Sequence, residues 1–290
     1  MLNRIKTDLL NFGLKHFISV DEKIVRIFLE TSPSNIYEIV ILPSVKMVMK
    51  KLIRKLRLKK VHGRVYNGEL NGVKVSIIRS LIGCPNCAIT VESLKRCGVK
   101  IIVRVDFCGG IENDTNQIKV GDILIPRLVY CGDGTSPYYI IKSPELMSSL
   151  EKISNPISKV QEIKAGNQNV YITKPNEEIK QNLLSEGKSH NVKEADFWTT
   201  DALFCETPDF LQALRSINVQ GIDMESSVLF LLGGIYNIKT ASILSVSDLP
   251  GHAKYDLFNA NVIHPDMEKG INNAIEILIN ALPKIKTKLK

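Results

Sequence analysis

The chain has 290 residues and a mass of 32.4 kDa, which exceeds the usual size of one hydrophobic core and falls short of two ordinary domains. A hydrophobic fraction of 44% and a charged fraction of 23% exclude a collagen-like, low-complexity or wholly disordered chain. No apolar run approaches the ~18–20 residues that cross a bilayer, and charged residues interrupt the N-terminal region. We therefore expect a soluble, cytoplasmic globular protein with no membrane partner.

The formal net charge of +8 comes from one segment. Between Lys46 and Lys60 there are eight basic residues and no acidic ones, so the rest of the chain is neutral overall. Val48, Leu52 and Leu56 recur at helical spacing, which predicts an amphipathic helix with a basic outer face. A solvated face is the simplest interpretation, and contact with RNA or a membrane surface is the alternative. The lack of aromatic residues among the charges disfavours nucleic acid.

Six cysteines spread over a chain of this length do not form a disulfide framework, so we expect reduced thiols. Cys84 and Cys87 have the CxxC spacing, but no second pair and no nearby pair of histidines accompanies them. A zinc or redox role is therefore the weaker alternative, and packing against a turn is the favoured one. No metal is expected.

The predicted elements alternate between strands and helices. After an amphipathic, helix-leaning extension over 1–34, β-branched apolar runs predict strands, and apolar residues three or four apart predict helices. The polar region 142–168 is left undecided. In chain order, the predictions are a strand over 36–42, a helix over 46–60, a strand over 72–78, a helix over 90–97, strands over 99–105, 120–125 and 169–173, helices over 206–217 and 223–235, a strand over 240–246 and a helix over 267–282.

This alternation predicts an α/β fold with an open, mixed central β-sheet flanked by helices. No linker divides the chain, so we expect a single domain over 35–290 that follows the extension. In such sheets ligands bind near the carboxyl ends of the strands, where polar residues that follow an apolar run are the most informative.

The first such segment runs from Arg104 to Gly110. A guanidinium at the end of a buried strand can bind an anion through paired hydrogen bonds, and Gly109 and Gly110 let backbone N–H groups approach it closely. The alternative is that Arg104 pairs with Asp106 or Asp122 as part of the scaffold.

The second and third segments carry carboxylates. In the segment 221–227, Asp223 can act as a helix cap, whereas Glu225 precedes an apolar helix and suits the vicinal hydroxyls of a sugar. Ser247 and Asp248 follow the strand predicted over 240–246. An acid there is either a turn residue or a general acid with a raised pKa.

Seven segments follow one another in a characteristic order: Gly83-Cys-Pro-Asn-Cys-Ala88, Val103–Ile111, Val120–Ile125, Asp133–Ser136, Trp198–Asp201, Asp223–Ser226 and Val246–Asp248. Each is weak alone, but the ordered set strongly resembles the nucleoside phosphorylase superfamily, which includes purine nucleoside and uridine phosphorylases. The resemblance extends from about residue 36 to the carboxyl terminus.

The resemblance implies an enzyme that cleaves the N-glycosidic bond of a nucleoside with inorganic phosphate and releases the base and ribose 1-phosphate. Phosphate is then a second substrate, and no cofactor or metal is needed. By resemblance, Arg104 and Gly109 bind phosphate, whereas Met224 and Glu225 bind ribose, with Glu225 on the 2′ and 3′ hydroxyls. The family also implies a homo-oligomer, either a hexamer or a trimer of dimers.

For the base, the resemblance implies contacts from Trp198, Ile222 and Ser247, and Asp248 is the acid that protonates purine N7. Uridine phosphorylases generally lack this acid, so a purine nucleoside is favoured and uridine is the alternative. Trp198 suits stacking on a flat heterocycle. Its other interpretation is a half-buried core residue.

The anion-binding residues depart from the family pattern. Asp106 and Phe107 replace a Gly-Thr or Gly-Ser pair, which removes a hydroxyl donor and adds a carboxylate. A Gly-Asp-Pro-x-Arg loop is replaced by the segment from Pro43 to Met47, where Lys46 is the only substitute cation. A histidine expected from a neighbouring subunit has no counterpart, and His16, His62 and His252 stay unassigned.

We therefore predict a nucleoside phosphorylase with a modified phosphate site. One alternative is a catalytically weak member that binds nucleoside or supports a partner subunit. Another is a nucleosidase in which water attacks the sugar. Against the latter, the acidic residue that nucleosidases of this superfamily place after the first strand is missing near Pro43.

Overall fold

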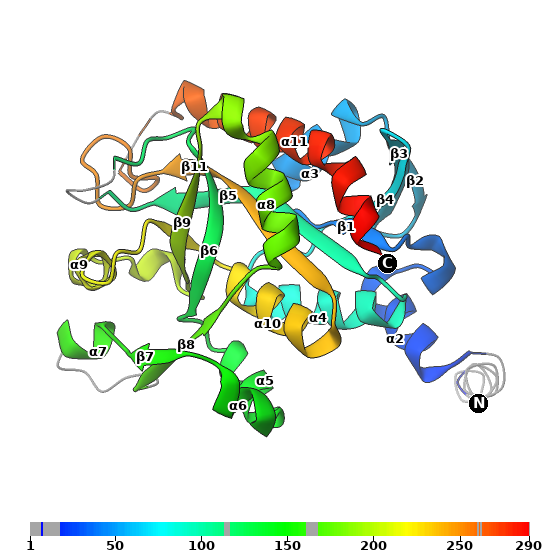
Figure 1. Cartoon of the computed structure of the whole chain (residues 1–290), viewed down its shortest axis with the longest axis horizontal. Helices are drawn as coiled ribbons and strands as arrows, with labels where there is room; N and C mark the ends of the chain where they lie inside the picture. Colours follow the sequence, from blue (N-terminus) through cyan, green and yellow to red (C-terminus); the bar gives the residue numbers. More distant parts are fainter. Residues whose placement is uncertain are drawn as a thin grey trace.

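The computed structural model describes Thr7 and residues 18–112, 117–160, 168–259, 261 and 263–289. They form a β-sheet with helices on both faces (Figure 1). The strands are β1 (Ile39–Ile41), β2 (Lys59–His62), β3 (Val65–Leu70), β4 (Val73–Ile78), β5 (Ile101–Gly110), β6 (Ile123–Cys131), β7 (Lys152–Ser154), β8 (Asn169–Thr173), β9 (Val192–Thr199), β10 (Gly221–Asp223) and β11 (Lys239–Asp248). The helices are α2 (Val20–Leu29), α3 (Lys46–Lys55), α4 (Cys84–Arg96), α5 (Ser136–Lys142), α6 (Pro144–Ser149), α7 (Ile157–Val160), α8 (Glu177–Glu186), α9 (Pro208–Arg215), α10 (Ser226–Tyr236) and α11 (Pro265–Lys286).

The sheet is mixed and partly closed. Its strands pair in the order β2-β3-β4-β1-β5-β10-β9-β6-β8-β7, and β11 pairs with both β5 and β6. Because β5, β10, β9, β6 and β11 pair in turn and return to β5, they form a ring. The predicted mixed sheet is confirmed, but the prediction that it is open is wrong. The reason is that β5 continues past its apolar run to Gly110, and this extension pairs with β10.

The register of the ring places distant residues side by side. Gly109 at the end of β5 pairs with Ile222 of β10 on one side and with Asp248 of β11 on the other. A Cβ atom at Gly109 would lie 2.7 Å from Ile222 and 3.0 Å from Pro250, so a larger residue would force these neighbours apart. The absence of a side chain at this position is what lets the three strand ends converge.

Two hydrophobic layers cover the sheet, with α3 and α11 above it and α4 and α10 below it in Figure 1. The apolar stripe predicted for the last helix, formed by Ile271, Ile275, Leu278 and Leu282, is fully buried in α11. The spacing of these residues puts them on one face of the helix, and that face packs on β11 and β5.

Several element boundaries differ from the predictions. The basic helix ends at Lys55, and the basic residues that follow continue into the exposed edge strand β2, which pairs with β3. The helix predicted over 223–235 begins at Ser226, and Asp223 instead ends β10, which pairs with β5 and β9. Strands β3 and β9, which the sequence analysis missed, are held in place by their neighbours in the sheet.

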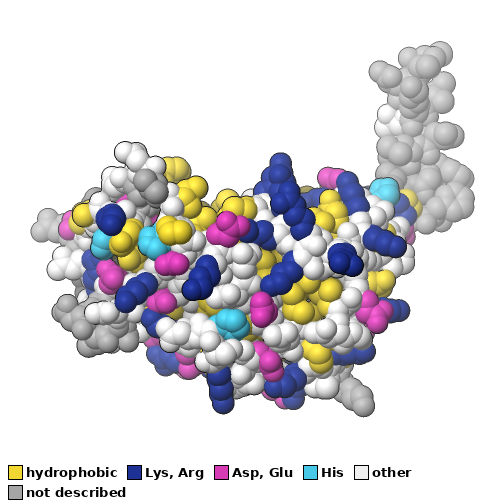
Figure 2. Space-filling model, turned by 90° about the horizontal axis from the view of Figure 1, so that it is seen from above, with side chains coloured by type: hydrophobic (Ala, Val, Ile, Leu, Met, Phe, Trp, Pro, Cys, Tyr) yellow, Lys and Arg dark blue, Asp and Glu magenta, His cyan; other side chains and the backbone are white. Residues whose placement is uncertain are grey.

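The basic face of α3 is partly neutralised by α11. Lys51 forms an ion pair with Glu268, and Lys55 lies 3.4 Å from Glu276. Figure 2 shows the face that carries these helices, where basic side chains are spread among acidic and apolar ones. This arrangement agrees with a solvated face. Among the described residues, no helix is long and apolar enough to span a membrane.

Helix α2, within the predicted extension, packs on α4. Val25 and Leu29 are fully buried in the layer that α4 and α10 form, and Asp21 pairs with Arg96 at 3.1 Å. Most of the first 17 residues, with His16, lie outside the described residues. The domain boundary at residue 34 stays a prediction.

The CxxC pair begins α4. Both Cys84 and Cys87 are fully buried free thiols, and burial raises the pKa of each. The Sγ atom of Cys84 donates a hydrogen bond to the carbonyl of Met224 at 3.2 Å. No cluster of metal-ligating side chains occurs in the described part of the chain. The pair therefore fits the packing interpretation.

Truncating the buried stripe of α11 should destabilise the whole fold. We expect Leu278→Ala to lower the free energy of unfolding by about 3 kcal/mol, because it leaves a cavity between α11 and the sheet. Urea denaturation followed by circular dichroism measures the loss. The exposed Asn280→Ala serves as the control, with an expected change below about 0.5 kcal/mol. Equal losses in the two variants would contradict the packing described here.

Candidate active site

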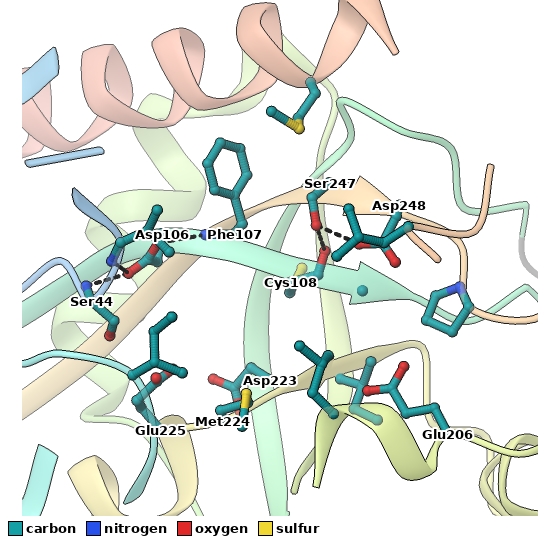
Figure 3. A pocket seen from close by; sticks show the side chains of 18 of the residues that line it. Ser44, Asp106, Phe107, Cys108, Glu206, Asp223, Met224, Glu225, Ser247 and Asp248 are labelled. Atoms are coloured by element: carbon teal, nitrogen blue, oxygen red, sulfur yellow. Dashed lines mark hydrogen bonds between the residues drawn. The ribbon is translucent and has the colours of Figure 1, made fainter. Parts of the chain in front are cut away.

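A cavity of about 320 Å³ opens where the ends of β5, β10 and β11 meet, a size typical of small-molecule sites. Its middle is apolar, whereas its polar side chains gather at two ends (Figure 3). We call these the Arg104 end, which holds Ser44, Arg104, Asp106, Asp223 and Glu225, and the Asp248 end, which holds Glu206, Ser247 and Asp248. The other lining residues are Val45, Met47, Ile82, Phe107, Cys108, Gly109, Leu203, Ile222, Met224, Pro250, Leu257 and Met267.

Arg104 is buried at 2% exposure and is held by two carboxylates. Its Nη1 donates to Asp223 at 2.9 Å and its Nη2 donates to Glu225. Burial alone would lower the pKa of Arg104, but Glu225 and Asp223 outweigh it and raise the pKa. A buried guanidinium is costly unless it is paired, so these contacts keep Arg104 charged.

Glu225 lies just before α10 and is 2% exposed. Its Oε1 accepts a hydrogen bond from the backbone N–H of Gly83 at 2.8 Å, and its Oε2 accepts one from Arg104. Gly83 has a φ of 98°, a backbone conformation that residues other than glycine rarely adopt. Burial raises the pKa of Glu225, and Arg104 opposes that rise. Each carboxylate oxygen keeps a lone pair that can accept a further hydrogen bond.

Asp106 is the third buried carboxylate at the Arg104 end. Its Oδ2 accepts hydrogen bonds from the backbone N–H groups of Ser44 and Val45, the latter at 3.2 Å. Its Oδ1 accepts one from the N–H of Phe107 at 3.0 Å. Figure 3 shows the carboxylate turned toward Ser44, in the loop between β1 and α3. Burial raises the pKa of Asp106, whereas Arg104 and the three N–H donors oppose that rise.

At the opposite end, Ser247 joins Asp248 to the main chain of β5. Its Oγ lies 2.5 Å from Oδ1 of Asp248 and 3.1 Å from the carbonyl oxygen of Cys108. A hydroxyl has one hydrogen and cannot donate to both acceptors at once. Both contacts are satisfied together when Asp248 carries a proton and donates it to Ser247. Burial raises the pKa of Asp248, and hydrogen bonds from Ser247 and from the N–H of Leu257 oppose that rise.

Glu206 is a site residue that the sequence analysis missed. It follows a short 3-10 turn (Leu203–Cys205) after β9 and lines the Asp248 end. Burial, with repulsion from Asp248 and Asp256, raises the pKa of Glu206 to about 8. The residue stands in no motif, and only its position soon after the segment that begins at Trp198 could have indicated it.

Seven of the eight predicted site residues line the cavity, namely Arg104, Gly109, Ile222, Met224, Glu225, Ser247 and Asp248. Trp198 is the exception. Its indole is 1% exposed and lies between Tyr130 and Phe210, with ring centroids 6.1 and 6.3 Å away. It packs over Gly132, where a Cβ atom would clash with the ring at 2.1 Å. The structure therefore places Trp198 in the core one strand away from the cavity, because β10 with Ile222 lies between β9 and β5.

Among the described residues, the other candidate cation and histidines, Lys46, His62 and His252, lie outside the cavity lining. Lys46 is exposed at the start of α3. His62 hydrogen-bonds through Nδ1 to the carbonyl of Glu30 at 2.6 Å, and His252 accepts N–H groups of its own loop. Among the described lining residues, five carry carboxyl groups and one carries a guanidinium. Even with Asp248 and Glu206 protonated, the other three carboxylates outnumber Arg104, so the lining is net negative.

Comparison with known proteins identifies the family. Residues 38–283 match the sequence model of the phosphorylase superfamily. The chain belongs to the phosphorylase superfamily. The membership predicted from the ordered segments is therefore confirmed, and so is the prediction that the protein is an enzyme of this superfamily.

Two relatives with similar sequences are purine nucleoside phosphorylases. The chain is 28% identical over 186 residues to a DeoD-type purine nucleoside phosphorylase of Buchnera aphidicola subsp. Schizaphis graminum, and the match covers 63% of this chain and 66% of that protein, slightly under two thirds. It is 27% identical over 218 residues to another such phosphorylase from Buchnera aphidicola subsp. Baizongia pistaciae, covering 75% of this chain and 78% of that protein.

Solved structures share the fold. A uridine phosphorylase of Vibrio fischeri superposes with a TM-score of 0.67 at 21% identity, covering 87% of this chain and 93% of that one. A purine nucleoside phosphorylase of Toxoplasma gondii gives a TM-score of 0.66 at 18% identity, covering 90% and 96%. These similarities confirm the α/β fold with a mixed central sheet flanked by helices.

The raised pKa of Glu206 predicts a pH-dependent stability. Between its ordinary value of 4.5 and about 8, the folded chain binds more protons at this residue than the unfolded chain does. The stabilisation of the folded state by protonated Glu206 is therefore fully present at low pH, and it is lost as the pH rises through that range. Between about pH 6 and pH 9 the free energy of unfolding of the wild type should fall by about 2–3 kcal/mol relative to that of Glu206→Gln, which has no titrating group at this position.

Urea denaturation at several pH values measures this difference. The exposed Glu145→Gln is the matched control and should follow the wild type at every pH. A Glu206→Gln variant with the same pH profile as the wild type would show that burial does not perturb this carboxyl group.

Proposed function

We propose that the protein cleaves the N-glycosidic bond of a purine nucleoside in this cavity. The observation that carries the proposal is the placement of Glu225 and Asp248 at opposite ends of one cavity with an apolar middle. A nucleoside has the matching order of groups, because a polar sugar is joined to a flat, largely apolar base with polar atoms at its edge. The purine nucleoside phosphorylases among the relatives support the same substrate class.

In this proposal the ribose lies at the Arg104 end. Glu225 is already fixed by Gly83 and Arg104, and its free lone pairs can accept the 2′ and 3′ hydroxyls. Met224 lies beside it in the lining and packs against the sugar. A carboxylate held in this way needs no reorganisation when the sugar becomes cationic.

The base lies between the apolar walls, with Ile222 on one side and Ser247 near its edge. Asp248 donates its proton to N7 of the purine as the bond breaks, which removes the negative charge from the leaving base. A general acid must hold its proton near neutral pH, and the burial of Asp248 raises its pKa in that direction. Glu206 lies at the same end and, with a pKa of about 8, offers a second protonated carboxyl group to the base.

The negative lining suits the transition state. Cleavage of the bond gives the sugar oxocarbenium character, and the buried carboxylates surround that positive charge. Family membership supports inorganic phosphate as the second substrate, with Arg104 and Gly109 nearest to it. The homo-oligomer, the absence of a cofactor and the cytoplasmic location stay predictions.

Removing the proposed acid should abolish purine cleavage selectively. We expect Asp248→Asn to reduce the rate of base release from inosine or adenosine by about 10²–10⁴-fold, because the amide has no acidic proton. Base release is followed by chromatography, and circular dichroism verifies folding. The exposed Asp209→Asn is the control and should keep the wild-type rate. Unchanged rates in Asp248→Asn, or cleavage of uridine but no purine by the wild type, would contradict the assignment.

The position of Trp198 predicts a structural effect. We expect Trp198→Phe to lower the free energy of unfolding by about 1–3 kcal/mol and to leave the KM for nucleoside nearly unchanged, since the indole lies outside the cavity. Ile222→Ala is the matched comparison and should raise the KM because Ile222 lines the cavity. A large rise in KM for Trp198→Phe without loss of stability would instead place the indole against the base.

A further inference from the structure

The backbone N–H groups at the amino end of α3 are already bound by the chain's own carboxylate, that of Asp106. We propose that Asp106 takes the place of inorganic phosphate and that the protein transfers the sugar to water, as a nucleoside hydrolase. This inference rests on the proposed cleavage of a nucleoside and changes the acceptor. It is argued from the donors around Asp106, from the partners of Arg104 and from the charge of the lining.

The loop between β1 and α3 has the form of an anion site. Ser44 and Val45 present their backbone N–H groups at the amino end of α3, and the helix dipole favours a negative charge there. Asp106 accepts both N–H groups through Oδ2. An anion from solution would have to displace this carboxylate, which is 1% exposed and covalently part of β5.

Arg104 is also occupied. Its two terminal nitrogens donate to Asp223 and Glu225, and Asp223 is fixed in turn by Thr199 at 2.7 Å and by the N–H of Ser226 at 3.1 Å. The Nε atom of Arg104 is buried without a hydrogen-bond partner among the described residues. A guanidinium has five N–H groups, and the contacts with Asp223, Ser226 and Glu225 leave two of them, on Nε and Nη2. The two carboxylates already balance the charge of Arg104, so it attracts a dianion less than an unpaired guanidinium would.

Charge repulsion adds to the scarcity of free donors. A phosphate dianion beneath the sugar would lie among Asp106, Asp223 and Glu225, with only Arg104 to offset them. Repulsion between like charges is strong in a cavity shielded from water. A neutral acceptor avoids this repulsion altogether, and water is the neutral acceptor that is always present.

Asp106 has the capacity to hold and activate that water. A carboxylate has about four acceptor sites, and three of those on Asp106 are used by Ser44, Val45 and Phe107. The remaining site, on Oδ1, can accept a hydrogen from a water molecule in the cavity. The desolvated environment of Asp106 makes the carboxylate a stronger base than an exposed one.

The step balances without another reactant. The water oxygen forms a bond to C1′ of the ribose as the bond from C1′ to the base nitrogen breaks, and the bonding pair leaves with the base. One water proton passes to Asp106, and the proton of Asp248 passes to N7. The products are free ribose and the neutral base, and transfer of the proton from Asp106 to solvent and uptake of one by Asp248 restore the site.

The decisive experiment compares the sugar product with and without phosphate. The full-length protein is incubated with inosine or adenosine in a phosphate-free buffer and in the same buffer with added inorganic phosphate, at matched ionic strength. We expect the same rate of base release in both, with free ribose as the product. Release that requires phosphate and yields ribose 1-phosphate would overturn this inference and leave the proposed cleavage intact. Absence of base release in both buffers would overturn the proposed function itself.

Variants of Asp106 test whether the carboxylate occupies the anion site. Asp106→Gly frees the N–H groups of Ser44 and Val45, so we expect phosphate to raise the melting temperature of this variant and not that of the wild type. We also expect its hydrolysis to fall by about 10²-fold or more, and added phosphate to restore base release with ribose 1-phosphate as the product. Asp106→Asn removes the charge, keeps the shape and should lose hydrolysis.

Asp196→Asn is the matched control, because Asp196 is a buried carboxylate of β9 that pairs with Arg127 outside the cavity lining. It should keep the wild-type rate and show no response to phosphate. A rise in the melting temperature of the wild type on adding phosphate would overturn the inference, because the site would then be free. This measurement on the wild type remains decisive even if the Asp106 variants fail to fold.

Discussion

The buried guanidinium of Arg104 is the interaction on which the site depends. It lies in the middle of β5 and binds Asp223 at the end of β10 and Glu225 at the start of α10. An unpaired charge at this depth would be strongly unfavourable, so separating the three groups would destabilise the fold. The pairing therefore orients Glu225 before any ligand arrives, and it joins the strand ends that enclose the cavity.

Close backbone approach complements this ion-pair network. Gly109 lets Ile222 and Pro250 come near β5, and the same residue pairs with Asp248 on the neighbouring strand β11. Gly83 adopts a conformation that other residues rarely take and directs its N–H group at Glu225. The two ends of the cavity are thus built from the register of the strands and from main-chain donors, which hold them more rigidly than flexible side chains would.

The excess of carboxylates links structure to chemistry. In the proposed reaction, a cavity of this sign would stabilise a positively charged sugar and repel an anionic partner, and both effects would grow as water is excluded. The superfamily fold is retained, whereas the donors at the start of α3 are bound to Asp106. We interpret the site as one in which the sugar and base contacts persist and the acceptor differs.

The sequence by itself determined the alternation of strands and helices, the buried stripe of α11 and the segments that hold Arg104, Glu225 and Asp248, because these depend on local periodicity and on residue types that are costly to bury. It did not determine the closure of the sheet or the location of Glu206 and Trp198. Those depend on which strands pair and in what register, and a shift of one strand moves a side chain from a cavity into the core. Sequence reasoning treated Asp106 as a lost donor, and only the tertiary structure brought its carboxylate to the N–H groups of Ser44 and Val45, since more than 60 residues of chain separate them.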